Sequence, residues 1–168
     1  MSLWWVFGFY LFERALETLI SIRNRLWLLA QGGRELYPQS YRGIVWLHAF
    51  FFVSLLIESA PWRVPFDRLT LDCLAILVFL QLMRYWGVAA AGRFWTPRLV
   101  VIPGVSFVRR GPFRFARHPN ALIVTLEFVV LPLLMRSPLT LLFFTLVNLA
   151  VLRWRIRLEE WGMRQSMA

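Results

Sequence analysis

Long apolar runs separated by short polar stretches dominate this chain of 168 residues. A helix that crosses a bilayer takes roughly 20 mostly apolar residues, and fewer where the segment tilts or enters part-way. The pattern predicts five such segments, at about Leu3–Ile22, Ile44–Ala60, Leu69–Ala91, Ala121–Met135 and Leu139–Leu152. We therefore expect an all-α integral membrane protein of about five transmembrane helices.

The segments between and after these runs carry structure of their own. Only Arg136-Ser137-Pro138 separates the last two runs, which predicts a tight helical hairpin. In the connection Gly92–Asn120, "RLVVIPG" and "VSFVRR" are β-prone runs around a Pro-Gly turn, and they predict a small hairpin or extended chain on the membrane surface. The final "RWRIRLEEWGM" has helical spacing. We expect a single domain over 1–168, with three spans in 1–91 and the loop, hairpin and tail helix in 92–168.

Composition and charge add a topology to this picture. The chain is 59% hydrophobic, its net charge is +10, and all nineteen basic residues are arginine. In a soluble protein such charge would indicate nucleic acid, but here the arginines flank apolar runs and act as topology determinants. Fourteen arginines fall on one side of the predicted spans and three on the other. The N-terminus is therefore expected outside, with the C-terminus and both arginine-rich loops in the cytoplasm and no nucleic-acid partner. The single Cys73 excludes a disulfide framework and a cysteine metal site.

The densest run of charge, "RRGPFRFARHPN", directly precedes the fourth apolar segment. Proline suits the first turn of a helix, so Pro119 places His118 at the helix start beside backbone N–H groups that have no partner in the helix. Such an end binds anions. The alternative is an interfacial arginine-histidine anchor.

A second candidate group lies in the tail, where Arg155 and Glu159 are four residues apart and share a helical face. The simplest interpretation is an ion pair on a solvated helix. Together with the His118 turn, however, a carboxylate near cationic groups and a helix N-terminus suits a ligand with both an ammonium and a carboxylate.

Two ionisable residues within the predicted spans, His48 and Glu127, are candidates for contact with a substrate. Charged groups in a membrane are costly, which makes them functional candidates. For Glu127 the competing interpretation is pairing inside the bundle. The available partners are Glu13, Arg14, Glu17 and Arg84.

These motifs resemble a known family. "RRGPFRFARHPN", an apolar hairpin and "RIRLEEWGM" are similar to the C-terminal half of the isoprenylcysteine carboxyl methyltransferase family, whose pattern there is G-x-Y, R-H-P-x-Y, a hairpin and R-x-x-x-E-E-x-x-L. The resemblance covers about Arg93–Met163. Further N-terminal, "ERALETLISIRNRLWLL", "YPQSYRGIVWLHAFFFVSLLIE" and "WTPRLVVIPG" resemble a bacterial subgroup associated with type III polyketide synthases and with O-methylation of alkylpyrones or alkylresorcinols.

The resemblance implies S-adenosyl-L-methionine as cofactor, a lipophilic substrate that enters from the bilayer, and a location in the inner membrane of a bacterium. Carried over by position, the cofactor site would consist of Val105, Ser106, Phe107, Val108, Phe113, His118, Pro119, Asn120, Ala121 and Glu159. Arg155 aligns with the catalytic arginine that faces the reacting oxygen of the substrate. Two positions depart from the pattern, because Phe113 and Ala121 stand where the family has tyrosine.

The expected function is therefore methyl transfer to an oxygen of a membrane-embedded substrate: a carboxylate, a hydroxypyrone or a phenol. The alternatives are a phospholipid N-methyltransferase, an NADPH-dependent sterol reductase-like enzyme, and a non-enzymatic membrane scaffold. No glycine-rich phosphate loop is present to support the reductase.

Overall fold

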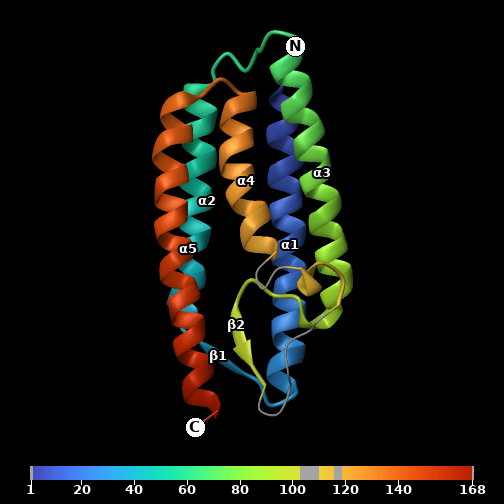
Figure 1. Cartoon of the computed structure of the whole chain (residues 1–168), viewed down its shortest axis with the longest axis vertical. Coiled ribbons are helices and arrows are strands. Elements are labelled where there is room, and N and C mark those ends of the chain that lie inside the picture. The colour runs from blue at the N-terminus through green and yellow to red at the C-terminus, as the bar shows by residue number, and fades with distance from the viewer. Residues whose placement is uncertain (1, 103–109, 116–118, 168) are drawn as a thin grey trace.

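The computed structural model describes residues 2–102, 110–115 and 119–167, and five α-helices run along one common axis (Figure 1). They are α1 (Trp4–Ala30), α2 (Pro38–Glu58), α3 (Arg68–Ala91), α4 (Pro119–Leu134) and α5 (Pro138–Met167). Buried apolar side chains from all five helices form one core cluster, which includes Phe7, Phe51, Leu77, Phe128 and Phe144. The expectation of an all-α membrane protein is confirmed at this level.

Membrane-spanning character differs among the helices. Segments Pro38–Glu58, Arg68–Phe94 and Pro138–Glu159 are long and apolar enough to cross a membrane, and Pro119–Leu134 is a shorter apolar helix. The first helix is also long, at 27 residues, but it carries charged side chains on its buried face. The hairpin of the last two helices is present, as predicted.

Two helices extend well beyond their predicted ends. The first continues to Ala30 rather than ending near Ile22, because Asn24 and Leu28 are buried against the rest of the molecule. The fifth runs from Pro138 to Met167 without interruption, so the predicted tail helix is the continuation of α5 and not a separate element.

One end of the bundle is tied together by polar contacts between the inter-helix connections. Glu58, the last residue of α2, accepts hydrogen bonds from the N–H groups of Leu139 and Thr140 at 2.8 and 2.7 Å. These are N–H groups that the first turn of a helix leaves without partners. Asp67 caps α3 by accepting from the N–H of Thr70 at 2.9 Å and pairs with Arg136 at 2.6 Å.

The opposite end contains a two-stranded antiparallel sheet. Strand β1 (Arg34–Leu36) pairs with β2 (Leu99–Val101), and Glu35 lies opposite Val100. The β-prone run at Leu99–Val101 does form a strand, but its partner is β1, and the predicted partner run "VSFVRR" lies almost entirely outside the described residues. Glycine is required at position 33, because a Cβ there would lie 2.6 Å from the Leu28 carbonyl oxygen and 3.1 Å from Val100 Cγ1.

Glu35 joins this sheet to two other parts of the chain. Its carboxylate accepts hydrogen bonds from Arg25 on α1 and from Arg98, the latter at 2.9 Å. Arg98 also lies over the ring of Tyr41 on α2, at 4.0 Å from the ring centroid. Burial alone raises the pKa of Glu35, but the hydrogen bonds from Arg98 and Arg25 outweigh it and hold the pKa below its ordinary value of 4.5.

Because this carboxylate is stabilised in the folded chain, we expect Glu35→Gln to destabilise the protein by roughly 1 kcal/mol at pH 7. A lowered pKa in the folded state gives stability that is complete above pH 4.5 and is lost as the pH falls through the folded-state value. Thermal unfolding of both proteins in detergent should therefore differ at pH 7 and converge near about pH 3. An undiminished difference at pH 3 would contradict the role given to the ionised carboxylate.

Candidate functional site

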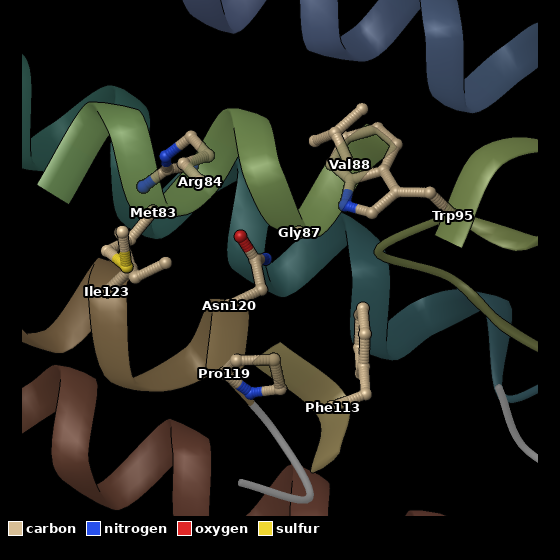
Figure 2. Close-up of a pocket in the computed structure, with 9 residues that line it drawn as sticks. All are labelled: Met83, Arg84, Gly87, Val88, Trp95, Phe113, Pro119, Asn120 and Ile123. Carbon is tan, nitrogen blue, oxygen red and sulfur yellow. The ribbon is translucent and has the colours of Figure 1, made fainter. Parts of the chain in front are cut away.

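A pocket lies at the start of α4 (Figure 2). At 16 residues, α4 is the shortest helix, about 24 Å at 1.5 Å per residue, and it begins roughly halfway along the bundle. Residues 92–102 and 110–115 occupy the space beyond its first residue. The pocket lies at this junction and is lined by Met83, Arg84, Gly87, Val88, Trp95, Phe113, Pro119, Asn120 and Ile123.

The start of α4 supplies the polar part of the pocket. Pro119 is the first residue of the helix and is buried. The Asn120 side chain points from that first turn toward Gly87 on α3 (Figure 2). No acidic residue occupies the first turn, so its N–H groups keep their positive partial charge. An amide side chain and the N–H groups of a first helical turn together suit a polar or anionic ligand group.

A short 3-10 helix, η2 (Gly111–Arg114), brings Phe113 to the pocket. Gly111 has φ of +56°, and a Cβ at this position would lie 2.6 Å from the Cβ of Ala90 on α3. Only glycine permits both the backbone conformation and this close approach. The Gly111-Pro112-Phe113 sequence therefore holds η2 close to α3 and brings Phe113 to the wall of the pocket.

Trp95 forms a second aromatic wall and is carried by a segment that we call the strap, residues 92–101, which includes η1 (Gly92–Phe94) and β2. Asn24 on α1, which is 2% exposed, donates hydrogen bonds to the carbonyls of Gly92 and Trp95 at 3.2 and 2.7 Å. The Ser21 and Thr96 hydroxyls lie 3.3 Å apart. These contacts fix the backbone on both sides of the indole.

Arg155 contacts the same strap from α5. Its guanidinium donates a hydrogen bond to the carbonyl of Pro97, two residues from Trp95. Glu159 lies one turn further along α5 and is half-buried, so the two predicted residues share a helical face. Neither lines the described pocket.

Three of the predicted cofactor residues, Phe113, Pro119 and Asn120, meet in the pocket, and Ala121 follows them in α4. The cavity volume is about 10 Å³, room for about one water molecule, which is far below the roughly 300–1,000 Å³ of ligand sites in general. Both flanking segments that carry other predicted residues, Val105, Ser106, Phe107, Val108 and His118, lie outside the described residues.

Sequence reasoning did not identify the α3 face of the pocket or the residues that hold the strap. Met83, Gly87 and Val88 share one face of α3 by their spacing, but in an apolar run this spacing looks like any other core pattern. Asn24 could have been recognised as a buried contact, because it is a polar residue on the same face of α1 as Glu13 and Glu17.

Glu127, one of the residues predicted to contact a substrate, belongs to a buried charge cluster of five residues: Glu13, Arg14, Glu17, Arg84 and Glu127. Arg84 is 2% exposed, and its guanidinium bridges Glu127 on α4 and Glu17 on α1, the latter at 3.1 Å. Arg14 lies 2.9 Å from Glu17 and 3.8 Å from Glu127. Glu127 is therefore paired inside the bundle, which is the interpretation that competes with contact to a substrate. Arg84 also lines the pocket, so the cluster borders it.

His48 lies away from the described lining of the pocket. Its Nδ1 is 2.8 Å from the carbonyl of Ile44, and its ring packs edge-on against Phe128, with 5.2 Å between centroids. It therefore contacts the residue next to Glu127 but not the cluster's carboxylates.

Comparison with known proteins agrees with the motif pattern. The sequence model of the isoprenylcysteine carboxyl methyltransferase (ICMT) family matches residues 73–165, which include α4, η2, the strap and most of α5. The uncharacterized protein YpbQ of Bacillus subtilis is 30% identical over 162 residues, 96% of both chains. An uncharacterized protein of Haemophilus influenzae is 27% identical over 145 residues, 86% of this chain and 84% of its own. No solved structure matches. Matched over more than half its length, the chain belongs to the isoprenylcysteine carboxyl methyltransferase family, a family of membrane methyltransferases.

Proposed function

We propose that this protein is an S-adenosyl-L-methionine-dependent methyltransferase that methylates an oxygen of a lipophilic, membrane-embedded molecule. The observation that carries the proposal is the pocket at the start of α4, where Phe113, Pro119 and Asn120 lie together. These residues belong to the motifs that carry the family resemblance, and they are the only predicted cofactor residues that line the described pocket.

The chemistry of the pocket fits such a cofactor. The rings of Trp95 and Phe113 and the side chain of Met83 offer apolar surface to an adenosyl group. The amide of Asn120 and the N–H groups of the first turn of α4 offer donors to the carboxylate of its amino-acid part. Among the described residues, a methyl group at Gly87 would contact Pro112 Cγ at 3.6 Å, so a side chain at this position would occupy part of the pocket.

The bound cofactor supplies an electrophilic methyl group on a sulfonium. What the protein contributes is alignment of the acceptor oxygen and exclusion of water. The strap, held by Asn24 and Arg155, covers one side of the pocket with Trp95. We place His118 and Glu159 around the same ligand and Arg155 on the side of the acceptor.

If Asn120 contacts the cofactor, Asn120→Ala should weaken binding of S-adenosylhomocysteine by about three- to tenfold, the loss expected for one hydrogen bond. Calorimetric titration of the detergent-solubilised protein measures this directly. Asn148→Ala is the matched control: that buried amide donates to the Thr125 hydroxyl at 3.1 Å and lies outside the pocket. Equal affinities in all three proteins would place the cofactor elsewhere.

A second pair of variants tests, by the same calorimetric titration, whether the ligand occupies the pocket beside Gly87. Gly87→Ala adds one methyl group to the pocket, while Gly8→Ala adds one where nothing lies within 4 Å. Replacing glycine by alanine favours a helix, so neither variant should unfold. Only Gly87→Ala should weaken S-adenosylhomocysteine binding. Binding of NADPH in place of S-adenosylhomocysteine would favour the reductase alternative. A protein that binds neither compound would favour the non-enzymatic membrane scaffold.

The acceptor and the orientation complete the proposal. We propose an alkylpyrone- or alkylresorcinol-type lipid as substrate, in the plasma membrane of a bacterium, with five spans and the pocket end toward the cytoplasm. Support for the orientation comes from the arginines, since the end with β1, β2 and the strap carries most of them.

Reporter fusions test this orientation. A fusion to the C-terminus should be active only with a reporter that functions in the cytoplasm, and a fusion ahead of α1 only with a periplasmic one. The reverse pattern would overturn the orientation without affecting the cofactor pocket.

A further inference from the structure

The pocket end of the bundle carries far more positive than negative charge. The segments on this side of the predicted spans contain fourteen arginines but three carboxylates, Glu35, Glu159 and Glu160. Glu35 is already engaged by Arg25 and Arg98. The chain's own carboxylates therefore neutralise a minority of these arginines, and the remaining positive charge attracts anions from outside the chain.

Two of these arginines flank a pair of aromatic rings between α1 and the strap. Trp27 on α1 and Phe94 in η1 pack edge to face, with 5.6 Å between ring centroids. The guanidinium of Arg93 lies over the Trp27 ring, 5.6 Å from its centroid. Arg23 lies one turn before Trp27 on α1 and is exposed, as is Arg93, and neither pairs with a carboxylate among the described residues. We call Arg23, Leu26, Trp27, Arg93 and Phe94 the interfacial patch.

This patch lies where α1 leaves the apolar part of a membrane. The helix is 27 residues long, about 40 Å at 1.5 Å per residue, whereas the hydrocarbon core of a bilayer is about 30 Å thick. Its apolar run ends near Ile22, so Arg23 and Trp27 belong to the part that protrudes. Leu26 and Phe94 are 58% and 43% exposed. Guanidiniums beside exposed apolar side chains at this depth match a phospholipid, which offers a phosphate next to its acyl chains.

The patch also shares its backbone with the wall of the pocket. Arg93 and Phe94 are exposed, whereas Trp95, the next residue, is buried and lines the pocket. Asn24 binds the carbonyls of Gly92 and Trp95, on either side of the two exposed residues. A ligand held by Arg93 therefore restrains the same short stretch of chain that positions the indole of Trp95.

We propose that the interfacial patch binds the headgroup of an anionic phospholipid and that the bound lipid steadies the strap. The guanidiniums of Arg23 and Arg93 hold the phosphate, and the apolar members of the patch contact the upper part of the acyl chains. Membrane topology requires arginines on one side of the spans, but it does not require two of them to flank an aromatic pair on the strap. A soluble phosphate would make no use of the exposed Leu26 and Phe94.

Native mass spectrometry of the whole protein in a neutral detergent tests the binding, because it measures how many lipid molecules stay bound. The probes are phosphatidylglycerol and phosphatidylcholine with identical acyl chains. Phosphatidylglycerol should reach half-occupancy at a concentration at least about fivefold lower, the gain expected when one arginine contacts an anionic lipid. Equal half-occupancy for the two lipids would overturn the proposal.

Matched variants locate the site. Arg93→Gln and Arg23→Gln each remove one charge from the patch, and each should weaken phosphatidylglycerol binding about fivefold. Arg42→Gln is the control, since it removes one charge from an exposed arginine on α2, at the same end of the bundle, whose side chain contacts Gln39. All three side chains are exposed, so the variants should unfold at the wild-type temperature. Equal losses in Arg93→Gln and Arg42→Gln would mean a diffuse attraction to this end and would contradict the site.

Hydrogen exchange tests the effect on the strap. With phosphatidylglycerol at about twice its Kd, amide exchange in residues 92–98 should slow about threefold, because opening of this segment then requires loss of the lipid. Arg93→Gln should show no such slowing, and residues 59–66 at the other end of the bundle should respond in neither protein. Unchanged exchange in the strap of a wild-type protein with bound lipid would overturn the link to the pocket wall. No cofactor enters these measurements, so their outcome is independent of the proposed function.

Discussion

Replacement of Arg84 by methionine is expected to lower the free energy of unfolding by roughly 3–5 kcal/mol. The reason is the position of its guanidinium, which is almost fully buried and bridges Glu17 and Glu127. Methionine has a similar length but no charge, so the buried carboxylates lose the charge that compensates them. The cost arises from the partners left behind more than from the contact that is lost.

Thermal or denaturant unfolding in detergent measures this effect, and Arg136→Met is its control. Arg136 pairs with Asp67 at an exposed end of the bundle, where both side chains reach solvent. An ion pair of that kind contributes at most about 1 kcal/mol. In a second step, Glu127→Leu added to Arg84→Met should recover part of the loss, because it removes one orphaned charge. Equal small effects at Arg84 and Arg136 would mean that the cluster is well hydrated.

For Arg155, we expect Arg155→Lys and Arg155→Ala to slow methyl transfer at least about tenfold, equivalent to roughly 1.4 kcal/mol in the barrier. Both variants should bind S-adenosylhomocysteine nearly as well as the wild type. A guanidinium holds an acceptor oxygen in a fixed plane, and an ammonium does not. An anionic oxygen loses charge when it is methylated, so the benefit lies mainly in orientation. Single-turnover kinetics with an alkylphenol or alkylpyrone acceptor measures the rate of methyl transfer, and calorimetric titration measures the affinity for S-adenosylhomocysteine.

The contact between Arg155 and the Pro97 carbonyl defines the competing outcome. If the arginine acts only by holding the strap, Arg155→Ala should lose cofactor affinity, because Trp95 lies two residues from Pro97 and forms part of the pocket. Asn24→Ala serves as the comparison, since Asn24 holds the Trp95 carbonyl from α1. Matching losses of affinity in Arg155→Ala and Asn24→Ala would assign Arg155 to the strap and not to the acceptor.

Sequence patterns predicted the helices better than the contacts between them. Apolar runs and their breaks located five helices and the α4–α5 hairpin, because burial in lipid or in a core demands such runs. The α3 segment was nearly correct at both ends, since Asp67 is a good cap and Gly92 takes a positive φ of 55°. The end of α1 was missed, because a polar residue that packs against the rest of the chain looks the same in sequence as a solvated one. The tail was predicted to be helical, but not as the continuation of α5.

The site followed from motifs only in part. Phe113, Pro119 and Asn120 come from segments adjacent in sequence, so the resemblance located them together. Trp95 and the α3 wall depend on packing between segments far apart, and nothing local marks them. The pairing of β1 with β2 was missed for the same reason, because a three-residue strand carries too little pattern to specify its partner.

The strap has a consequence for the order in which the protein assembles. Its anchoring contacts join residues far apart in the chain: 71 positions separate Asn24 from Trp95, 63 separate Glu35 from Arg98, and 58 separate Pro97 from Arg155. Contacts of such separation form late, since the entropy of closing each loop opposes them until the intervening helices are in place. Glu35 leaves the ribosome long before Arg98, and Pro97 long before Arg155. We therefore expect the wall of the pocket at Trp95 to be completed only after α5 has been made, late in folding.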